Sequence, residues 1–175
     1  MKPKELLSRL VKPRSVFEYI IFTLIVAGVV GLDQLTKLLA VKFLKPIDTY
    51  PIIEGVIHLT YVENRGAAFG MMADKRWIFL TLSTITIIVL AFILFSGFLT
   101  NKLYTLPVSM IISGGIGNMI DRLALGYVVD FIDFRLINFA VFNVADSIVC
   151  VGAALLVLAT LIDIIKESKA KKGSA

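Results

Sequence analysis

The chain has 175 residues, of which 58% are hydrophobic and 18% are charged, and its formal net charge is +5. A mean hydropathy of +0.88 excludes an ordinary soluble domain of this length. A membrane-spanning helix needs about 20 mainly apolar residues, so we expect one integral-membrane domain over residues 1–175. The single cysteine, Cys150, excludes an internal disulfide or a cysteine metal cluster.

Four apolar runs predict four transmembrane helices. In chain order they cover about residues 17–44, 77–99, 103–123 and 144–165. The second run is rich in β-branched residues and would suit a strand in a soluble protein. In lipid, however, a spanning segment has to satisfy its own backbone hydrogen bonds, so this run is predicted to be helical. The first run is too long for a signal peptide and has a polar second half.

Basic residues predict the orientation of these helices. They precede the first run, follow the last run and stand between the second and third runs: Lys2, Lys4, Arg9, Lys12 and Arg14; Lys166, Lys169, Lys171 and Lys172; Lys102. Both termini are therefore expected to be cytoplasmic, and the loops at about 45–76 and 124–143 to lie on the outer face. The pI near 9.4 then reflects topology and anionic lipid headgroups. We expect contact with membrane lipid and none with nucleic acid.

The first outer loop predicts a small sheet on the membrane surface. Residues Val56–Val62 are β-prone, and Asn64-Arg65-Gly66 is a turn signal. The next segment, about Ala67–Met72, is small and apolar and could dip into the membrane interface. His58 is the only histidine, and we interpret it as a strand residue because no second histidine or cysteine accompanies it.

Polar residues gather at the outer ends of the third and fourth runs. Charged side chains at membrane depth are costly and indicate function. Three clusters qualify: Gly114–Arg122 with Asn118 and Asp121, Gly126–Phe134 with Asp130 and Asp133, and Phe142–Ser147 with Asn143 and Asp146. Each cluster contains at least one carboxylate in an apolar context.

Hydrolysis by paired carboxylates is the chemistry that fits these clusters best. Two neighbouring carboxyl groups share a proton, so that one can activate a water while the other protonates the leaving amine. A Ser147 nucleophile with Lys37 or His58 as its base has no support in the spacing. Each acid could instead belong to a buried ion pair, such as Asp121 with Arg122 or Asp33 with Lys37. Spacing alone leaves these interpretations open.

Five motifs, in one order along nearly the whole chain, narrow the choice. They are Asp33-Gln34-Leu35-Thr36-Lys37, Asn64-Arg65-Gly66-Ala67-Ala68-Phe69, Gly117-Asn118-Met119-Ile120-Asp121-Arg122, Val128-Val129-Asp130-Phe131 and Phe142-Asn143-Val144-Ala145-Asp146-Ser147. Together they resemble the motif set of the lipoprotein signal peptidase family, also called signal peptidase II. The resemblance implies a membrane all-α fold with four transmembrane helices, a small extracytoplasmic β-cradle and a short surface helix. It also implies a bacterial inner-membrane aspartic endopeptidase that cleaves diacylglyceryl-modified prolipoproteins just before the lipid-modified cysteine.

The same resemblance implies a role for each polar residue. Asp130 and Asp146 would be the catalytic pair, acting on water without a metal or other cofactor. Four residues would hydrogen-bond the substrate backbone and orient the acids: Asn64, Asn118, Arg122 and Asn143. The supporting residues would be Asp33 and Lys37, pairing to tie the first span to the cradle, Gly66 in the turn after Asn64, and Asp121. Three glycines would form a groove for the substrate: Gly114, Gly115 and Gly117. Asp133 falls outside the motifs and is assigned to loop structure.

Two other classes of function were weighed against the peptidase. A small transporter that relays protons through intramembrane acids would place those acids near mid-span and show internal repeats. The acids instead cluster at helix ends on one side. A structural membrane subunit would tolerate Asp130→Asn and Asp146→Asn without loss of a chemical activity. We expect a peptidase that acts as a monomer.

Overall fold

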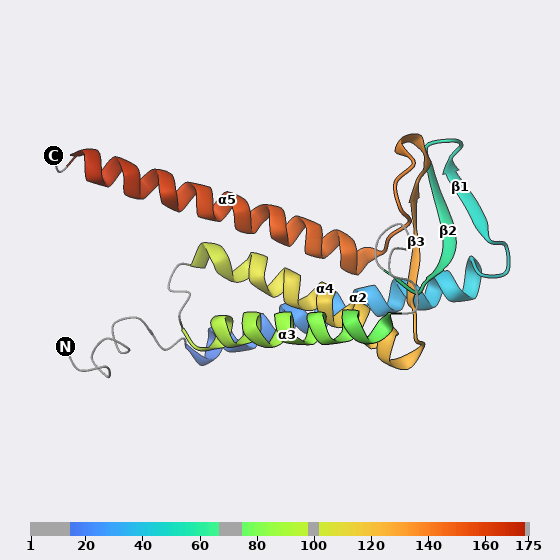
Figure 1. Cartoon of the computed structure of the whole chain (residues 1–175), viewed down its shortest axis with the longest axis horizontal. Helices are drawn as coiled ribbons and strands as arrows, with labels where there is room; N and C mark the ends of the chain where they lie inside the picture. Colours follow the sequence, from blue (N-terminus) through green and yellow to red (C-terminus); the bar gives the residue numbers. More distant parts are fainter. Residues whose placement is uncertain (1–14, 67–74, 98–101, 174–175) are drawn as a thin grey trace.

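A computed structural model describes residues 15–66, 75–97 and 102–173 of the chain, and Figure 1 shows their arrangement. The long helices are α2 (Val16–Phe43), α3 (Arg76–Phe95), α4 (Thr105–Ala124) and α5 (Val144–Gly173). Three strands, β1 (Thr49–Ile53), β2 (Ile57–Asn64) and β3 (Val128–Phe134), form a sheet at one end of the helices. Two short 3₁₀ turns, η2 (Lys102–Tyr104) and η3 (Arg135–Ile137), complete the described elements.

Local sequence explains where the helices begin and end. Ser15 and Glu18 form a capping box at the start of α2: the Glu18 amide donates to Ser15 Oγ at 3.2 Å and the Ser15 amide donates to Glu18 Oε2 at 3.0 Å. Gly97, at φ +80, follows the end of α3, a position where glycine tolerates the left-handed conformation. Helix α5 continues to Gly173, past the predicted end near Ile165, because the lysines, glutamate and alanine that follow are good helix formers.

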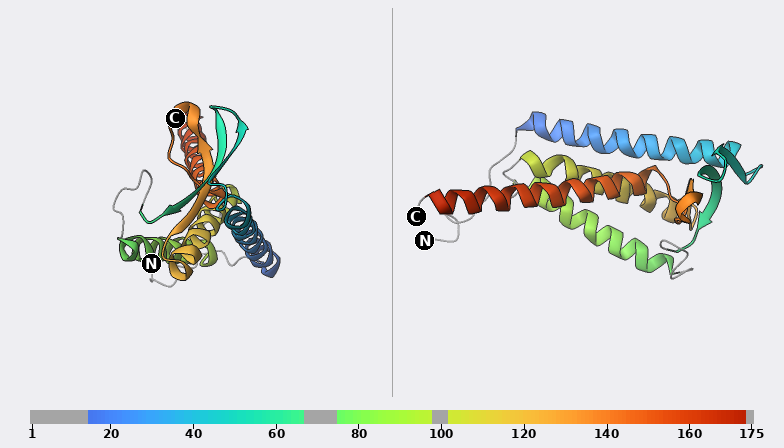
Figure 2. Two further views of the ribbon diagram at one scale, coloured as in Figure 1. Left: turned by 90° about the vertical axis from the view of Figure 1, so that its right-hand side faces the viewer. Right: turned by 90° about the horizontal axis from the view of Figure 1, so that it is seen from above.

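Three of the helices, α2, α3 and α5, are long and apolar enough to cross a membrane. Helix α4 is not among these three, whereas the sequence predicted four spans. Its polar content has a structural reason. Helix α4 packs against each of the other three helices, as both views in Figure 2 show, and it buries polar side chains such as Ser109 and Ser113 among them. Shielded from its surroundings by its neighbours, α4 can carry polar residues that a lipid-facing helix could not.

The sheet is small, open and antiparallel, in the order β1-β2-β3. The sequence predicted the central strand, and the structure adds one strand on each side of it. Pro51, which cannot donate to a ladder, lies opposite His58 on the edge strand β1, where proline is tolerated. The segment at about 67–72, expected to be a surface helix, lies outside the described residues.

Strand β3 joins the sheet to the helices and thereby fixes the candidate site. Val129 and Phe131 are buried in one apolar cluster with Ala40 and Leu44, at the end of α2. Asp130 lies between these two anchoring residues, and it is itself 1% exposed. Because successive side chains of a strand alternate between faces, burying both flanking residues holds Asp130 in a defined position.

Candidate active site

The core of the polar region is a buried ion cluster between α2 and α4. Lys37 Nζ lies 2.9 Å from Asp33 Oδ2 and 3.0 Å from Asp121 Oδ2, and all three side chains are buried. Its third donor reaches Asn118 Oδ1 at 2.9 Å, so each of the three ammonium hydrogens has a partner. The Asp33–Lys37 pair suggested by the four-residue spacing is therefore present. The contacts of Lys37 with Asp121 and Asn118 join α2 to α4. Asp33 Oδ1 also accepts a hydrogen bond at 2.9 Å from the amide of Ala145, in the first turn of α5.

Asp121 belongs to this ion cluster and not to a pair with Arg122. Besides Lys37, it accepts from Gln34 Nε2 at 2.9 Å and from the Val129 amide at 3.0 Å, so it connects α2 and α4 to β3. Arg122 is the next residue on the helix and points about 100° away. The sequence could not anticipate this, because Gln34 and Val129 approach Asp121 from distant parts of the chain.

Asp146 is held at the start of α5 by a reciprocal cap. The Asp146 amide donates to Asn143 Oδ1 at 2.9 Å, and Asp146 Oδ2 accepts from the Asn143 amide at 3.2 Å. This is the hydrogen-bond pattern of a capping box. The other oxygen, Oδ1, accepts from Asn118 Nδ2 at 2.7 Å. A carboxylate in the first helical turn also benefits from the positive end of the helix dipole.

Asp130 approaches the same place from the sheet. Its Oδ1 accepts from Asn143 Nδ2 at 2.7 Å, and its Oδ2 accepts from Asn64 Nδ2 at 2.8 Å. Burial raises the pKa of Asp130 to about 7, and the nearby charge of Asp146 acts in the same direction, while the two amide hydrogen bonds oppose the rise. Asn143 thus bridges the acids, with its side-chain amide on Asp130 and its backbone amide on Asp146.

Both acids line a cavity of about 500 Å³ between β3, α4 and the start of α5. Its polar wall also includes Asn64, Asn118 and Arg122. Arg122 donates from Nη2 to the Gly66 carbonyl at 3.4 Å, and its Cζ lies 5.2 Å from the centre of the Phe79 ring. A carboxyl pair beside one guanidinium and several amides can bind a peptide backbone and polarise a carbonyl group.

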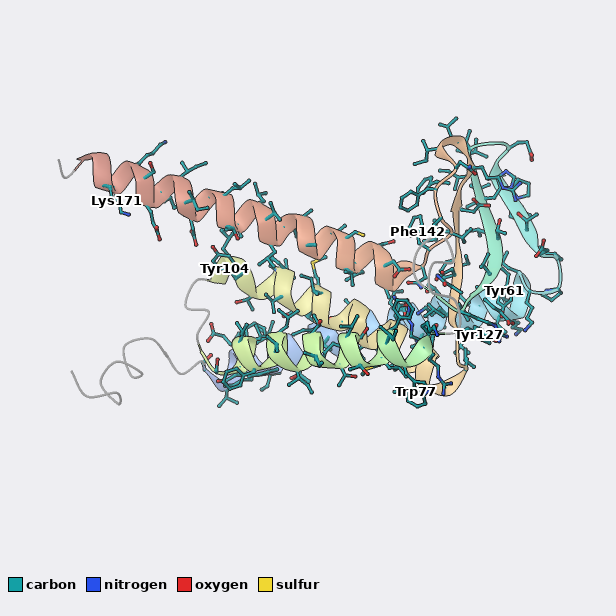
Figure 3. All side chains as sticks on the ribbon, viewed as in Figure 1. Tyr61, Trp77, Tyr104, Tyr127, Phe142 and Lys171 are labelled. Atoms are coloured by element: carbon teal, nitrogen blue, oxygen red, sulfur yellow. The ribbon has the colours of Figure 1, made fainter. Side chains whose placement is uncertain are left out.

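The opposite wall of the cavity is apolar, and sequence reasoning missed it. It is formed by residues of β3, η3 and the segment that leads into α5: Phe134, Ile137, Phe139, Val141 and Phe142. Phe142 lies between β3 and the first turn of α5 in Figure 3, and it stacks on Phe134 with ring centres 5.6 Å apart. The run of aromatic residues just before Asn143 was the signal that could have indicated this wall.

Five predicted site residues line the cavity, and Asn143 lies behind it. Asn64, Asn118, Arg122 and the acids all line the space, but Asn143 is 0% exposed. Its polar side-chain atoms are occupied by Asp130, Asn118 and the Asp146 amide. Of the two roles expected for it, this position suits orienting the acids and leaves no free donor for a substrate. Gly66 does close the turn after Asn64, since its amide donates to Asn64 Oδ1 at 3.0 Å.

The rival residues have other partners. Asp133 accepts from Arg135 Nε at 2.9 Å and from Thr60 Oγ1 at 2.8 Å, and these contacts outweigh its burial and lower its pKa. His58 is buried in β2, and its Nε2 accepts from the Gly55 amide at 3.1 Å. The Ser147 hydroxyl donates to the Asn143 carbonyl at 2.9 Å, a common arrangement for a serine in the first turn of a helix. Neither Lys37 nor His58 is placed as a base for Ser147.

The glycines of α4 are in helix contacts, and the expectation that they form a substrate groove is wrong. A Cβ built on Gly114 would collide with the Ala145 carbonyl of α5, and one on Gly117 would lie 2.5 Å from Asp33 Oδ2 on α2. Gly115 faces Ile87 of α3 at 3.3 Å. The small residues therefore let α4 approach all three neighbours closely. In the described part of the chain, no group of three His, Cys, Asp or Glu side chains is placed to hold a metal ion.

The family model and the similar sequences point to one family. A family model described as signal peptidase (SPase) II matches residues 19–162. The chain is 54% identical over 132 residues to a lipoprotein signal peptidase of Caldanaerobacter subterraneus subsp. tengcongensis, covering 75% of this chain and 90% of that protein. It is 47% identical over 137 residues to one of Halothermothrix orenii, covering 77% and 91%. A solved structure, described as a bacterial membrane enzyme, superposes with a TM-score of 0.76 at 33% identity and covers 82% of this chain and 89% of its own.

Proposed function

Because the chain belongs to the signal peptidase II family, membrane aspartic endopeptidases that remove signal peptides from prolipoproteins, we propose that Asp130 and Asp146 form its catalytic pair. One observation carries this proposal: the two carboxylates come from different elements, meet at one cavity and are bridged by Asn143. The other acids near them, Asp33 and Asp121, both form an ion pair with Lys37. The substrate would be a diacylglyceryl-modified prolipoprotein, cleaved just before its lipid-modified cysteine.

The reaction is a direct attack of water on the scissile carbonyl. The ionised carboxyl of the pair removes a proton from the water, while the protonated carboxyl donates its hydrogen to the carbonyl oxygen. The C–O bond forms, the tetrahedral intermediate collapses, and the C–N bond breaks as a proton passes to the leaving amine. The products are a signal peptide with a free carboxylate and a lipoprotein with a free amino group on its cysteine. No cofactor is needed for this sequence of steps.

Each remaining polar residue supports one part of the reaction. Arg122 has donors beyond the one directed at Gly66, and these can bind substrate carbonyl groups. Asn64 and Asn118 each direct a side-chain amide at one acid and border the space where the peptide would lie. Asn143 is buried behind the cavity wall and orients both acids through its hydrogen bonds to Asp130 and Asp146. The apolar wall opposite them suits a substrate whose cysteine carries lipid chains.

The membrane arrangement that supports this function has four spans, with α4 as the central one. Basic residues before α2, after α5 and between α3 and α4 support a cytoplasmic position for those ends. The sheet and the cavity, at the other end of the helices, then face outward, where an exported prolipoprotein arrives. Labelling of cysteines introduced at Glu54 and at Lys169 with a membrane-impermeant maleimide tests the orientation. Reaction at position 54 alone in intact cells agrees with it, and the reverse pattern contradicts it.

A gel-shift cleavage assay on a diacylglyceryl-modified prolipoprotein tests the catalytic pair. Asp130→Asn and Asp146→Asn should each abolish cleavage while the purified proteins remain folded in detergent. Asp133→Asn removes an acid from the same strand outside the cavity and is the matched control, which should keep its activity. Cleavage that survives at Asp130→Asn would move the assignment to Asp121. If a folded wild-type protein cleaved no such substrate, the peptidase proposal itself would fail.

A further inference from the structure

A second groove lies between α3 and α4, at the end of the helices nearest the sheet. It has a volume of about 340 Å³ and is lined by Met119 and Leu123 of α4 and by five α3 residues between Trp77 and Ile85. None of these residues lines the cavity that holds the acids. On α4, Asn118 and Arg122 face that cavity, whereas the next residue in each case, Met119 and Leu123, faces the groove about 100° further round.

The groove is apolar and faces the surroundings of the helices. Trp77 and Leu123 are 68% and 61% exposed, and α3 is one of the helices apolar enough to cross a membrane. Thr84 directs its hydroxyl to Met119 Sδ of α4 at 3.5 Å. Trp77 to Ile85 extends along α3 by roughly 12 Å at 1.5 Å per residue. That depth is close to the thickness of one leaflet of the hydrocarbon core, about 15 Å.

A cation stands at the mouth of this groove. Arg76 is the first residue of α3, and its guanidinium lies over the Trp77 ring, with Cζ 4.8 Å from the ring centre. On its other side, Arg76 Nη1 is 3.3 Å from a Cβ built on Gly126, which adopts φ +88. The side chain is thus held between a ring and a turn. Among the described residues, no acidic side chain forms an ion pair with it.

We propose that this groove binds an anionic phospholipid of the bilayer, with one acyl chain between α3 and α4 and the phosphate against Arg76. The positive charge of Arg76 suits an anionic headgroup, and the apolar groove beside it suits an acyl chain. A tryptophan beside an arginine at the level of the headgroups is the arrangement found at membrane interfaces. One cation near an anionic surface gives about a fivefold preference for an anionic over a zwitterionic lipid.

The fluorescence of Trp77 can report on this site, because Trp77 is the only tryptophan in the sequence. The protein is reconstituted in phosphatidylcholine vesicles that contain increasing fractions of phosphatidylglycerol with brominated acyl chains, which quench tryptophan fluorescence on contact. Brominated phosphatidylcholine serves as the reference quencher. We expect the relative association of phosphatidylglycerol to exceed that of phosphatidylcholine by about fivefold.

Variants then identify the cation responsible. Arg76→Gln should reduce the preference to about one, and Arg76→Lys, which keeps the charge, should retain most of it. Lys45→Gln removes a half-exposed cation that pairs with Glu63 and does not line the groove, and it should leave the preference unchanged. Cleavage activity of each variant confirms that it is folded.

Three results would overturn the proposal. Equal quenching by the two lipids in the wild type would mean ordinary contact with surrounding lipid and no headgroup selection. A preference that survives Arg76→Gln would place the recognition elsewhere. Little quenching by either lipid would mean that the groove is covered by protein and is not open to the bilayer.

Discussion

Asp130→Asn is expected to stabilise the folded protein at neutral and alkaline pH while it abolishes cleavage. The reason is the burial of a carboxyl group that is 1% exposed and whose pKa burial raises from 3.8 to about 7. Above that pH the folded protein has to keep a buried negative charge, which the unfolded chain holds in water. An asparagine at this position is neutral at every pH and removes that cost.

The size of the effect follows from two opposing contributions. One pKa unit corresponds to 1.36 kcal/mol, so the elevated pKa is worth about 4 kcal/mol at pH 8. Against this, Asn64 Nδ2 and Asn143 Nδ2 both donate to the oxygens of Asp130. In the variant one of them would face an amide NH₂ group, which costs about 1–3 kcal/mol. The net gain at pH 8 is therefore about 1–3 kcal/mol, or roughly 2–10 °C in Tm.

The pH dependence of this gain distinguishes it from a simple packing effect. Between about pH 4 and 7 the folded wild-type protein binds a proton at Asp130 that the unfolded chain has released. Its free energy of unfolding therefore falls as pH rises through this window and levels off above it. The advantage of Asp130→Asn should be full at pH 8 and should disappear toward pH 4.

Thermal unfolding in detergent at pH 5 and pH 8 tests this reasoning, with Asp133→Asn as the matched control. Asp133 has a lowered pKa and partners in Arg135 and Thr60, so its stabilising contribution is present at both pH values and is lost only as pH falls below its ordinary range. The control should therefore be less stable than the wild type, by similar amounts at pH 5 and pH 8. A variant at Asp130 that is no more stable than the wild type at pH 8, or that gains equally at both pH values, would refute the argument.

Four further outcomes are expected. Gly114→Ala should separate α4 from α5 and lower both Tm and cleavage rate, whereas Gly28→Ala, with no atom within 4 Å of the new Cβ, should stay within about 0.5 kcal/mol of the wild type. Lys37→Met should cost about 3–5 kcal/mol, because it leaves two buried carboxylates without their cation, and should greatly reduce the yield of folded protein. Arg122→Ala should raise KM more than it lowers kcat, and an unchanged KM would argue against substrate binding by this residue. Cleavage should be unchanged in a metal chelator, and a loss restored by a defined metal would contradict a cofactor-free reaction.

The helices could be predicted because a segment that spans the lipid bilayer has to satisfy its own backbone hydrogen bonds. Continuous apolar runs have one stable backbone conformation in a membrane, and the helices α2, α3 and α5 lie in such runs. For helix α4, composition alone is not sufficient to predict a membrane span. Its glycines, serines and Asn118 lower its hydropathy, and only the packing of three helices around it explains how it carries them. That packing depends on contacts distant in sequence.

The sequence pointed to residues that meet at one cavity, but it did not indicate the contacts between them. Motif order pointed to Asp130 and Asp146, and the structure brings both to one cavity. Sequence neighbours were a poor guide to partners, however. Asp121 pairs with Lys37 from another helix instead of with adjacent Arg122, because neighbouring residues on a helix point in different directions.

The side chains that donate hydrogen bonds to Asp130 and Asp146 are asparagines and not cations, and this choice has a chemical reason. Lys37 contacts Asp33 and Asp121 directly, at 2.9 and 3.0 Å, whereas the side-chain amides of Asn64, Asn118 and Asn143 contact Asp130 and Asp146. A catalytic pair needs one member able to keep a proton, so its nearest donors have to be neutral. Amide groups meet this need, since they donate hydrogen bonds and add no charge. Asn118 links the two regions: its Oδ1 accepts from Lys37 while its Nδ2 donates to Asp146. Because an ammonium has no acceptor, Lys37 fixes the orientation of that amide and so positions Asp146 without touching it.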